Sequence, residues 1–441
     1  MSTEICFHED GWLFPNDRDA NTVHELTTES IYQLIDLSEK EDEAYKSGIE
    51  QIVGQRDAEI RSGKPTGSHW ELKELAVTYS NGAIVPYPNG LQTITFSSKE
   101  HLYRGENKKY SSCKPSLRRE LKNIADPKEK ELHFALAMLR KWLFADFLCQ
   151  INVVPYWIAK ISDVNFDALA QHYGFKTNLL DLTNDFKTAL FFATCKYDKA
   201  TVTFRPLTQQ DIKQSEDTGF GYIYHTPSGR IDFLKGGYSK FLMKANKRQC
   251  LQNGEMDGCA FQIGYQPLYR CHYQNGYVYP MRYAKDLLED HFFEKLRFRQ
   301  SEELSSYVYK MMDEGKKVFP NEGITEVQSI LEKKIQNSVH FTDEQLRCVY
   351  ELEGINKTLF PRFEDLLRAI NGFQIPEGNI KIFDFDSFIR PSIPKELLEI
   401  VNTHYDGKDL LEPIGGSFYR TVFQQQYREQ KCLEIFGRLI D

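Results

Sequence analysis

The chain has 441 residues, enough for two or three domains of ordinary size. Its composition, 41% hydrophobic and 27% charged, is that of a folded globular protein. The net charge of −8 argues against general nucleic-acid binding, because such binding needs Lys and Arg to neutralise phosphates. Residues 1–20 lack the basic and apolar regions of a signal peptide, and no apolar run approaches the length of a membrane span. We therefore expect a cytoplasmic protein without a membrane partner.

Residues 1–93 are predicted to form an N-terminal extension that consists of a helix and a hairpin. The helix is expected over 28–52, where apolar residues share one face opposite an acidic face. Two Asn-Gly pairs between β-prone runs predict short strands over 76–97. These strands would lead into the tripeptide 103–105 and place Arg104 at a strand end.

In the central part of the chain, helical patterns come first and extended patterns follow. Apolar residues at helical spacing predict a core helix over 128–150, whose His133 is expected to be exposed or hydrogen-bonded rather than a metal ligand. Residues 199–300 are mostly extended in pattern and predict an antiparallel sheet. This division favours an α+β fold, with a helical first half and an antiparallel-sheet second half, over a doubly wound parallel sheet.

The stretch 167–193 places polar groups next to apolar residues that are expected to be buried. A helix is predicted over 167–172, and Gly174 would end it in a left-handed conformation. After a short extended segment, Asp181 or Thr183 is expected to cap the next helix. Two interpretations of this Asp and this Thr stay open, namely helix caps and members of a polar site.

The pattern changes again towards the C-terminus. Residues 283–296 predict a helix or a transition from helix to strand, and 325–335 predict another helix. Further helices are predicted over 346–359, 363–370 and 427–440, with a strand over 381–386. We therefore expect a central domain over 94–332 and a mostly helical accessory domain over 340–441.

Several enzyme and metal-site motifs are missing from the sequence. It contains no glycine-rich nucleotide loop, His-Glu-x-x-His pair or Gly-x-Ser-x-Gly turn. The motifs that are typical of dehydrogenases, kinases and serine hydrolases are therefore missing. The nine cysteines are odd in number and show no Cys-x-x-Cys spacing. We therefore expect scattered reduced thiols, with neither a disulfide framework nor a bound metal.

Four landmarks, in this order along the chain, resemble the FRG-domain family, which is named after a Phe-Arg-Gly motif. In the first landmark Tyr103 replaces the Phe, and Glu106 stands where the family often has Gln. The remaining landmarks are the stretch 171–193, the Arg-x-x-x-Gln-x-Gly element of Arg270, Gln274 and Gly276, and the closing segment 318–323. The resemblance covers roughly 94–332.

The resemblance also suggests a chemistry for Arg104. A guanidinium can hold a phosphate or carboxylate through two parallel hydrogen bonds, and Gly105 beside it would let a ligand approach the backbone. The Tyr-Arg-Gly motif is similar to the opening motif of mono-ADP-ribosyltransferases, whose Arg grips nicotinamide dinucleotide (NAD). That likeness gives Thr183 or Thr177 the role of a supporting hydroxyl. No Glu pair lies on a later strand, and Gln274 would stand in that place without a negative charge.

The site implied by the resemblance has two groups of residues. The expected catalytic residues are Arg104, His172 and Gln274. His172 is either a general base or phosphate donor, or a core residue that bonds a backbone carbonyl. The residues expected to bind NAD are Tyr103, Gly105, Thr177, Asp181, Thr183 and Arg270, and no metal is expected.

Two functions follow from this reading of the residues. The first is an enzyme that uses NAD as a substrate and transfers ADP-ribose to a macromolecule, either protein or nucleic acid, as a toxin or phage-defence effector. The second is a non-catalytic ligand-sensing or interaction module, in which Arg104 and the 171–183 cluster form a structural polar core.

Overall fold

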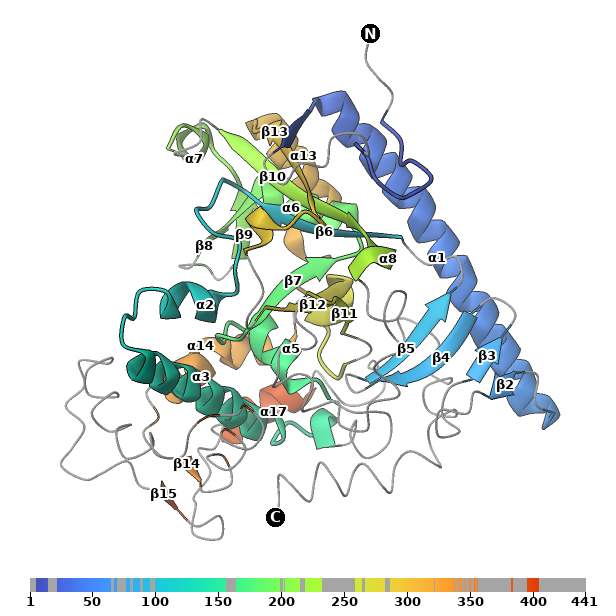
Figure 1. Cartoon of the computed structure of the whole chain (residues 1–441). Coiled ribbons are helices and arrows are strands. Elements are labelled where there is room, and N and C mark those ends of the chain that lie inside the picture. Colours follow the sequence, from blue (N-terminus) through green and yellow to red (C-terminus); the bar gives the residue numbers. More distant parts are fainter. Residues whose placement is uncertain are drawn as a thin grey trace.

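The structure is a computed structural model of the whole chain (Figure 1). It describes residues 5–14, 22–64, 67–69, 77–79, 82–87, 90–95, 100–155, 164–198, 201, 203–214, 219–231, 258–263, 266–281, 286–320, 322–336, 338, 341–342, 345, 349, 353, 355, 382–383 and 395–403.

Among the described residues, the largest sheet has seven strands. Their order is β1 (Val23–Leu26), β13 (Glu294–Arg299), β10 (Phe220–Pro227), β6 (His101–Glu106), β7 (Leu179–Thr183), β12 (Gly276–Pro280) and β11 (Phe261–Gln262). The pair β1–β13 is parallel, and the other neighbours are antiparallel. Within the described strands, β6 and β7 pair at a single position, Tyr103 opposite Thr183, whereas β6 and β10 pair along six residues. The sheet therefore opens between β6 and β7.

Helices cover one face of this sheet around β6. Helix α6 (Phe186–Thr194) packs on β6, and α13 (Glu302–Met311) and α1 (Thr28–Ser62) pack on α6. Their apolar side chains form one core with Tyr103, whose ring meets that of Phe186 edge to face at 5.5 Å between centroids. The opposite face carries a second core built on Leu102, Leu182 and Tyr224. The alternation of Leu102 and Tyr103 between two cores is the period-two pattern of a strand buried on both faces.

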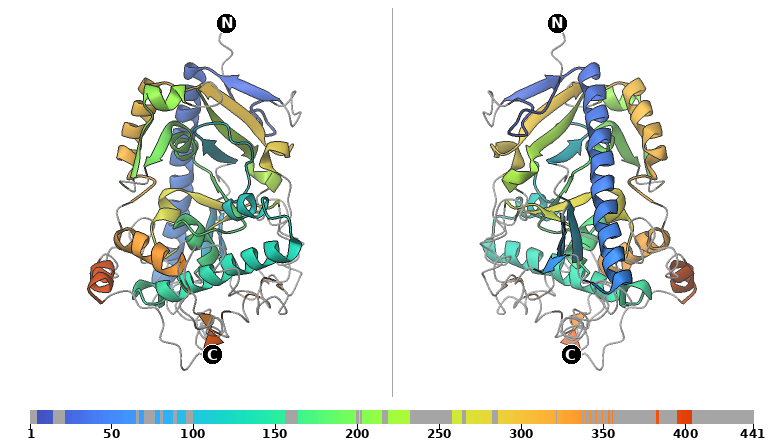
Figure 2. Two further views of the ribbon diagram at one scale, coloured as in Figure 1. Left: turned by 90° about the vertical axis from the view of Figure 1, so that its left-hand side faces the viewer. Right: turned by 90° about the vertical axis from the view of Figure 1, so that its right-hand side faces the viewer.

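A helical layer lies beside the sheet. It contains α2 (Ser116–Leu121), α3 (Pro127–Leu148), α5 (Phe166–His172), α14 (Gly323–Gln336) and α17 (Lys395–Thr403). The largest hydrophobic core joins these helices. The long helix α1 runs along the molecule, and its far end contacts the sheet β2 (Ser68–His69), β3 (Val77–Tyr79), β4 (Gly82–Tyr87) and β5 (Gly90–Thr95) (Figure 2).

Short elements complete the described fold. Strands β8 (Cys195–Asp198) and β9 (Thr203–Pro206) form a hairpin that is followed by α7 (Gln209–Lys213). The others are α8 (Ser228–Ile231), α12 (Arg270–Tyr273), η1 (Leu287–Glu289), η2 (Asp313–Gly315), β14 (Phe341–Thr342) and β15 (Ile382–Phe383).

Many predicted elements are confirmed, and the fold is α+β as expected. The N-terminal helix is α1, which is longer than predicted and ends at Gly63 in a left-handed conformation with φ 63°. The core helix is α3, and the hairpin strands are β3, β4 and β5. Gly174 has φ 92° after α5. The division into halves is less sharp than predicted, because β6 and β7 belong to the same sheet as the later strands.

Two local predictions are wrong. Arg104 lies within β6 rather than at a strand end, and β5 belongs to a different sheet from β6. Neither Asp181 nor Thr183 caps α6; the N-cap is Asp185, whose carboxylate accepts from the backbone amides of residues 187 and 188. Of the two alternatives for the stretch 283–296, the transition from helix to strand is confirmed, because the short η1 is followed by the start of β13.

The ends of the chain bear on the predicted domain boundaries. Strand β1 lies in the predicted N-terminal extension, yet it pairs with β13 at the edge of the main sheet. Most of the predicted helices at 346–359 and 363–370, and the whole of 427–440, lie outside the described residues. The boundaries at 93, 332 and 340 stay predictions. None of the helices in the described ranges has both the length and the apolar character needed to span a membrane.

Candidate functional site

A cavity of about 680 Å³ opens where β6 and β7 separate. One wall comes from β6 and the segment after it, including Arg104, Glu106 and Lys108. The opposite wall comes from β7 and includes Asp181 and Thr183. The cavity continues to the end of α6, the β8–β9 hairpin and α7. The cavity at the split in the sheet is lined by six of the nine predicted site residues, namely Tyr103, Arg104, Gly105, Asp181, Thr183 and Gln274.

Arg104 is the central cation of this cavity. Its Nε donates to Glu106 Oε1 at 3.2 Å, and its Nη1 donates across the split to the carbonyl oxygen of Asp181 at 2.9 Å. A fifth of the side chain stays exposed. Burial opposes the charge, but the negative charges of Glu106 and Asp181 raise the pKa of Arg104 above its usual value. The guanidinium is therefore fixed, permanently charged and still able to donate to a ligand.

Glu106 is a residue of this site that the sequence did not indicate beyond its departure from the family pattern. Its carboxylate is buried and accepts from Arg104, from the Tyr224 hydroxyl at 3.2 Å and from the Cys113 thiol at 3.4 Å. Burial raises the pKa of Cys113, so the thiol stays protonated and is a poor nucleophile. Glu106 therefore positions Arg104.

Gly105 is required by packing rather than by ligand approach. A Cβ at this position would lie 1.8 Å from the carbonyl oxygen of Ala189 in α6. The side of Gly105 that lacks a side chain thus faces the helix. The prediction that it lets a ligand approach the backbone is wrong in its reason, although the residue does line the cavity.

On the β7 wall, hydroxyl and amide groups connect the strand to neighbouring loops. Thr183 Oγ1 donates to the carbonyl oxygen of Gln274 at 2.7 Å and accepts from the Asp185 amide at 3.1 Å. The Gln274 side chain donates to the carbonyl oxygen of Val318 at 2.9 Å. Thr183 and Gln274 both line the cavity, but these groups are already engaged in holding its wall.

Three predicted site residues do not line the cavity. Thr177 is buried, and its hydroxyl donates to Gln171 at 2.5 Å. Arg270 is buried between the rings of Tyr173 and Phe319, each at 4.3 Å, and donates to the carbonyl oxygen of His172 at 2.6 Å. These two residues support the cavity from outside it.

His172 also lies behind the β7 wall rather than on it. Its side chain is buried, and its Nε2 lies 3.8 Å from Asp181 Oδ1. Burial lowers the pKa of His172, with Asp181 acting in the opposite direction. The imidazole is therefore neutral near pH 7, and it lies next to Asp181, which lines the cavity.

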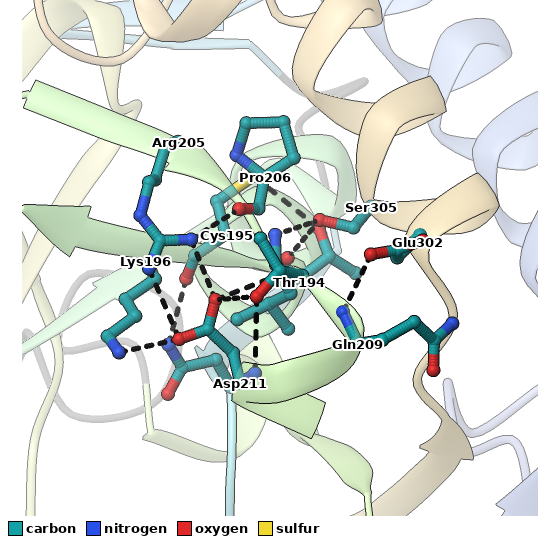
Figure 3. Close-up of polar contacts among 12 residues, drawn as sticks. Thr194, Cys195, Lys196, Arg205, Pro206, Gln209, Asp211, Glu302 and Ser305 are labelled. Carbon is teal, nitrogen blue, oxygen red and sulfur yellow. Dashed lines mark hydrogen bonds and ion pairs between the residues drawn. The ribbon is translucent and has the colours of Figure 1, made fainter. Parts of the chain in front are cut away.

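The far wall of the cavity is a cluster of hydrogen-bonded polar side chains, centred on Asp211, that joins the β8–β9 hairpin to α7 (Figure 3). Asp211 accepts from both terminal nitrogens of Arg205, at 2.7 and 3.1 Å, and from Lys196 at 2.7 Å. The hydrogen bonds from Arg205, with those from Lys196 and Thr208, hold the pKa of Asp211 well below its usual range despite partial burial. Lys196 and Asp211 line the cavity, together with the half-exposed ring of Tyr197. No periodic pattern in the sequence indicated this wall of the cavity.

Comparison with known families supports the assignment made from the motifs. Residues 99–201 match the family model of the FRG domain, which takes in the Tyr103 motif and the stretch 171–193. The Arg270 and 318–323 landmarks lie beyond the match. No curated protein and no solved structure matches the chain. Groups of three or more His, Cys, Asp or Glu that could hold a metal ion are absent from the described residues. The chain therefore contains an FRG domain, and that domain supplies Arg104, Asp181 and Thr183 to the cavity.

Proposed function

We propose that the cavity binds NAD and that the protein transfers ADP-ribose from it to a macromolecular acceptor. The observation that carries the proposal is the partly exposed guanidinium of Arg104 on the cavity wall, held in place by Glu106 and by the carbonyl oxygen of Asp181. A guanidinium held in this way can donate to a phosphate without losing further side-chain entropy. The Tyr-Arg-Gly motif gives the same role to Arg104 by its resemblance to mono-ADP-ribosyltransferases.

The composition of the cavity supports a dinucleotide as ligand. Its volume of about 680 Å³ lies within the usual range of small-molecule sites, roughly 300–1,000 Å³. Lys108 and Arg119 add cationic groups near Arg104, which suits a pyrophosphate. The aromatic rings of Tyr197, Phe192 and Phe204 line the other end, where a planar ring can pack.

The acceptor would be a protein or a nucleic acid, and the setting would be that of a toxin or a phage-defence effector. The net charge of −8 disfavours general binding to nucleic acid, which makes protein the better acceptor to test first. Transfer to a macromolecule needs a cavity open to solvent on one side. The exposed fractions of Lys108, Tyr110 and Lys196, which line the cavity, agree with such an opening.

A non-catalytic role is the second candidate. It is favoured by the two protein partners of Arg104, because a structural ion pair with Glu106 uses the same guanidinium. In that case the cavity would sense a ligand, or the polar cluster would only stabilise the split sheet.

Radiolabelled NAD incubated with the protein and a cell lysate separates the two functions. The enzyme predicts label in macromolecules, and Arg104→Lys should abolish most of it, because an ammonium cannot keep the bonds to Glu106 and Asp181 and also reach the ligand as a fixed guanidinium does. Arg297→Lys is the matched control, since Arg297 pairs with Glu25 on the surface and does not line the cavity. Equal labelling by native protein and Arg104→Lys would contradict the proposal.

A further inference from the structure

Asp181 lies directly across the split from Arg104. Its carbonyl oxygen accepts from Arg104 Nη1 at 2.9 Å, and its side chain, which is 38% exposed, lines the cavity. The backbone bond fixes the distance between the guanidinium and the start of the Asp181 side chain. A ligand held by Arg104 would therefore lie beside the Asp181 carboxylate.

The Asp181 carboxylate is held from behind by a short chain of neutral groups. Gln171 Nε2 donates to Asp181 Oδ2 at 3.1 Å. The carbonyl end of Gln171 is fixed in turn by the Thr177 hydroxyl at 2.5 Å, and Thr177 accepts from the Leu179 amide at 3.1 Å. This chain sets the orientation of Gln171 and therefore the plane of the carboxylate.

His172 adds an unusual feature behind the same carboxylate. His172 Nε2 and Asp181 Oδ1 are 3.8 Å apart, and both are buried atoms without a hydrogen-bond partner among the described residues. Buried polar atoms without partners are rare and cost roughly 1–3 kcal/mol each, so they call for an explanation. At 3.8 Å the two atoms lie just beyond hydrogen-bond distance, so the imidazole limits how far the carboxylate can move back from the cavity.

The other carboxylates of the cavity are neutralised by cations. Of the three carboxylates on its described wall, Glu106 bonds Arg104, and Asp211 bonds Arg205 and Lys196. The Asp181 carboxylate accepts a hydrogen bond from the neutral amide of Gln171 and lies beside the neutral imidazole of His172, and it attracts the charge of Arg104 without a hydrogen bond between these two described side chains. Its negative charge therefore faces a ligand that Arg104 holds.

We infer that Asp181 is the catalytic carboxylate of the proposed ADP-ribosyl transfer, and that Gln171 and His172 are the residues that position it. This inference rests on the proposed function. Cleavage of an N-glycosidic bond develops positive charge on the ribose ring, and a fixed carboxylate nearby stabilises that charge. Asp181 on β7 would take the place of the Glu pair that the sequence lacks on a later strand.

The step balances with the groups at hand. The bond between ribose C1′ and the nicotinamide nitrogen breaks, and its electron pair goes to the nitrogen, which leaves as neutral nicotinamide. C1′ then bonds to an oxygen or nitrogen of the acceptor, or to water. The acceptor's proton passes to the Asp181 carboxylate and from there to solvent. No oxidant or reductant is needed.

Release of nicotinamide from NAD tests the inference with Asp181→Asn, which keeps the shape and removes the charge. We expect a kcat at least about 100-fold lower than that of the native protein, with NAD affinity changed less than about threefold. Asp313→Asn is the matched control, because Asp313 is exposed, lies away from the cavity and has φ 49°, which Asn tolerates well. If Asp181→Asn proves unstable, Asp181→Ser serves as the second variant.

The outcomes separate this inference from the proposed function. If native protein releases nicotinamide and Arg104→Lys does not, but Asp181→Asn keeps the native kcat, the inference is overturned and the proposed function stands. If native protein neither binds nor cleaves NAD, both are overturned.

The positioning role of His172 has its own readout. His172→Gln replaces the rigid ring behind Asp181 with a flexible side chain, so the carboxylate loses the group that limits its movement away from the cavity. We expect a lower kcat at an unchanged KM for NAD. A merely structural His172 would lower the unfolding midpoint and leave kcat of the folded protein at the native value, which would overturn the positioning role.

Discussion

Replacement of Gly105 by Ala would place a methyl group 1.8 Å from the carbonyl oxygen of Ala189 and 2.9 Å from the backbone nitrogen of Ala193. Both atoms belong to the backbone of α6, so neither can turn aside as a flexible side chain would. Because ordinary van der Waals contact begins near 3.4 Å, strand β6 and helix α6 would have to separate by roughly 1.5 Å.

The size of the effect follows from what lies on either side of this contact. The core between β6 and α6 contains Tyr103 and Phe186, both essentially fully buried. Overpacking of a dense core costs about 1–3 kcal/mol and sometimes more. Since the clash involves rigid backbone in the centre of the sheet, we expect a loss of about 3 kcal/mol or more for Gly105→Ala.

Urea denaturation of Gly105→Ala measures this loss, with Gly229→Ala as the control. A Cβ at Gly229 would meet nothing within 4 Å, so that variant should match or exceed native stability by up to about 1 kcal/mol. Surviving Gly105→Ala protein should also bind NAD more weakly, because Arg104 moves with β6. A Gly105→Ala protein that unfolds within about 0.5 kcal/mol of native would refute the packing argument.

Three further predictions concern stability and domain organisation. Asp185→Ala should lower the free energy of unfolding by about 2 kcal/mol, measured by urea denaturation, because the Asp185 carboxylate caps α6 and accepts from Ser38. A similar loss in Asp181→Asn would argue that Asp181 has a structural role. Burial opposes the charge of Glu294, but the contact with His225 at 2.6 Å lowers the pKa of Glu294. The stabilisation from ionised Glu294 is therefore present above the ordinary pKa of about 4.5 and is lost as the pH falls below that value. The acid side of a pH–stability curve should therefore flatten in Glu294→Gln, and an unchanged slope would contradict this assignment. Limited proteolysis should cut first between 334 and 342, and early cleavage inside 171–193 would contradict the predicted division of the chain.

Local structure was predictable where the signal lies within a few residues. The helical spacing of α1 and α3, the Asn-Gly pairs between β3, β4 and β5, and the left-handed Gly174 are all of this kind. The cap of α6 was placed two to four residues too early, because Asp181, Thr183 and Asp185 are all good caps and only the end of β7 decides between them.

The site was predictable in part. Arg104, Asp181, Thr183 and Gln274 share one cavity, as the motif order suggested. Glu106 positions Arg104, Gly105 allows close packing on α6, and the Asp211 cluster closes the far wall of the cavity. These roles depend on which strands become neighbours. Sheet order here runs through β13, β10, β6, β7 and β12, and hydrophobic periodicity within a strand carries no information about such non-consecutive pairing.

Isothermal titration of NAD into native protein and Arg104→Lys tests the central claim most directly. The account predicts measurable binding to native protein and an affinity about ten- to hundredfold lower in Arg104→Lys, since one charge-assisted hydrogen bond is worth roughly 1.5–3 kcal/mol. Arg297→Lys should bind as native does. Equal affinity in Arg104→Lys and native protein, or no binding to a folded native protein, would contradict the claim that Arg104 makes this cavity an NAD site.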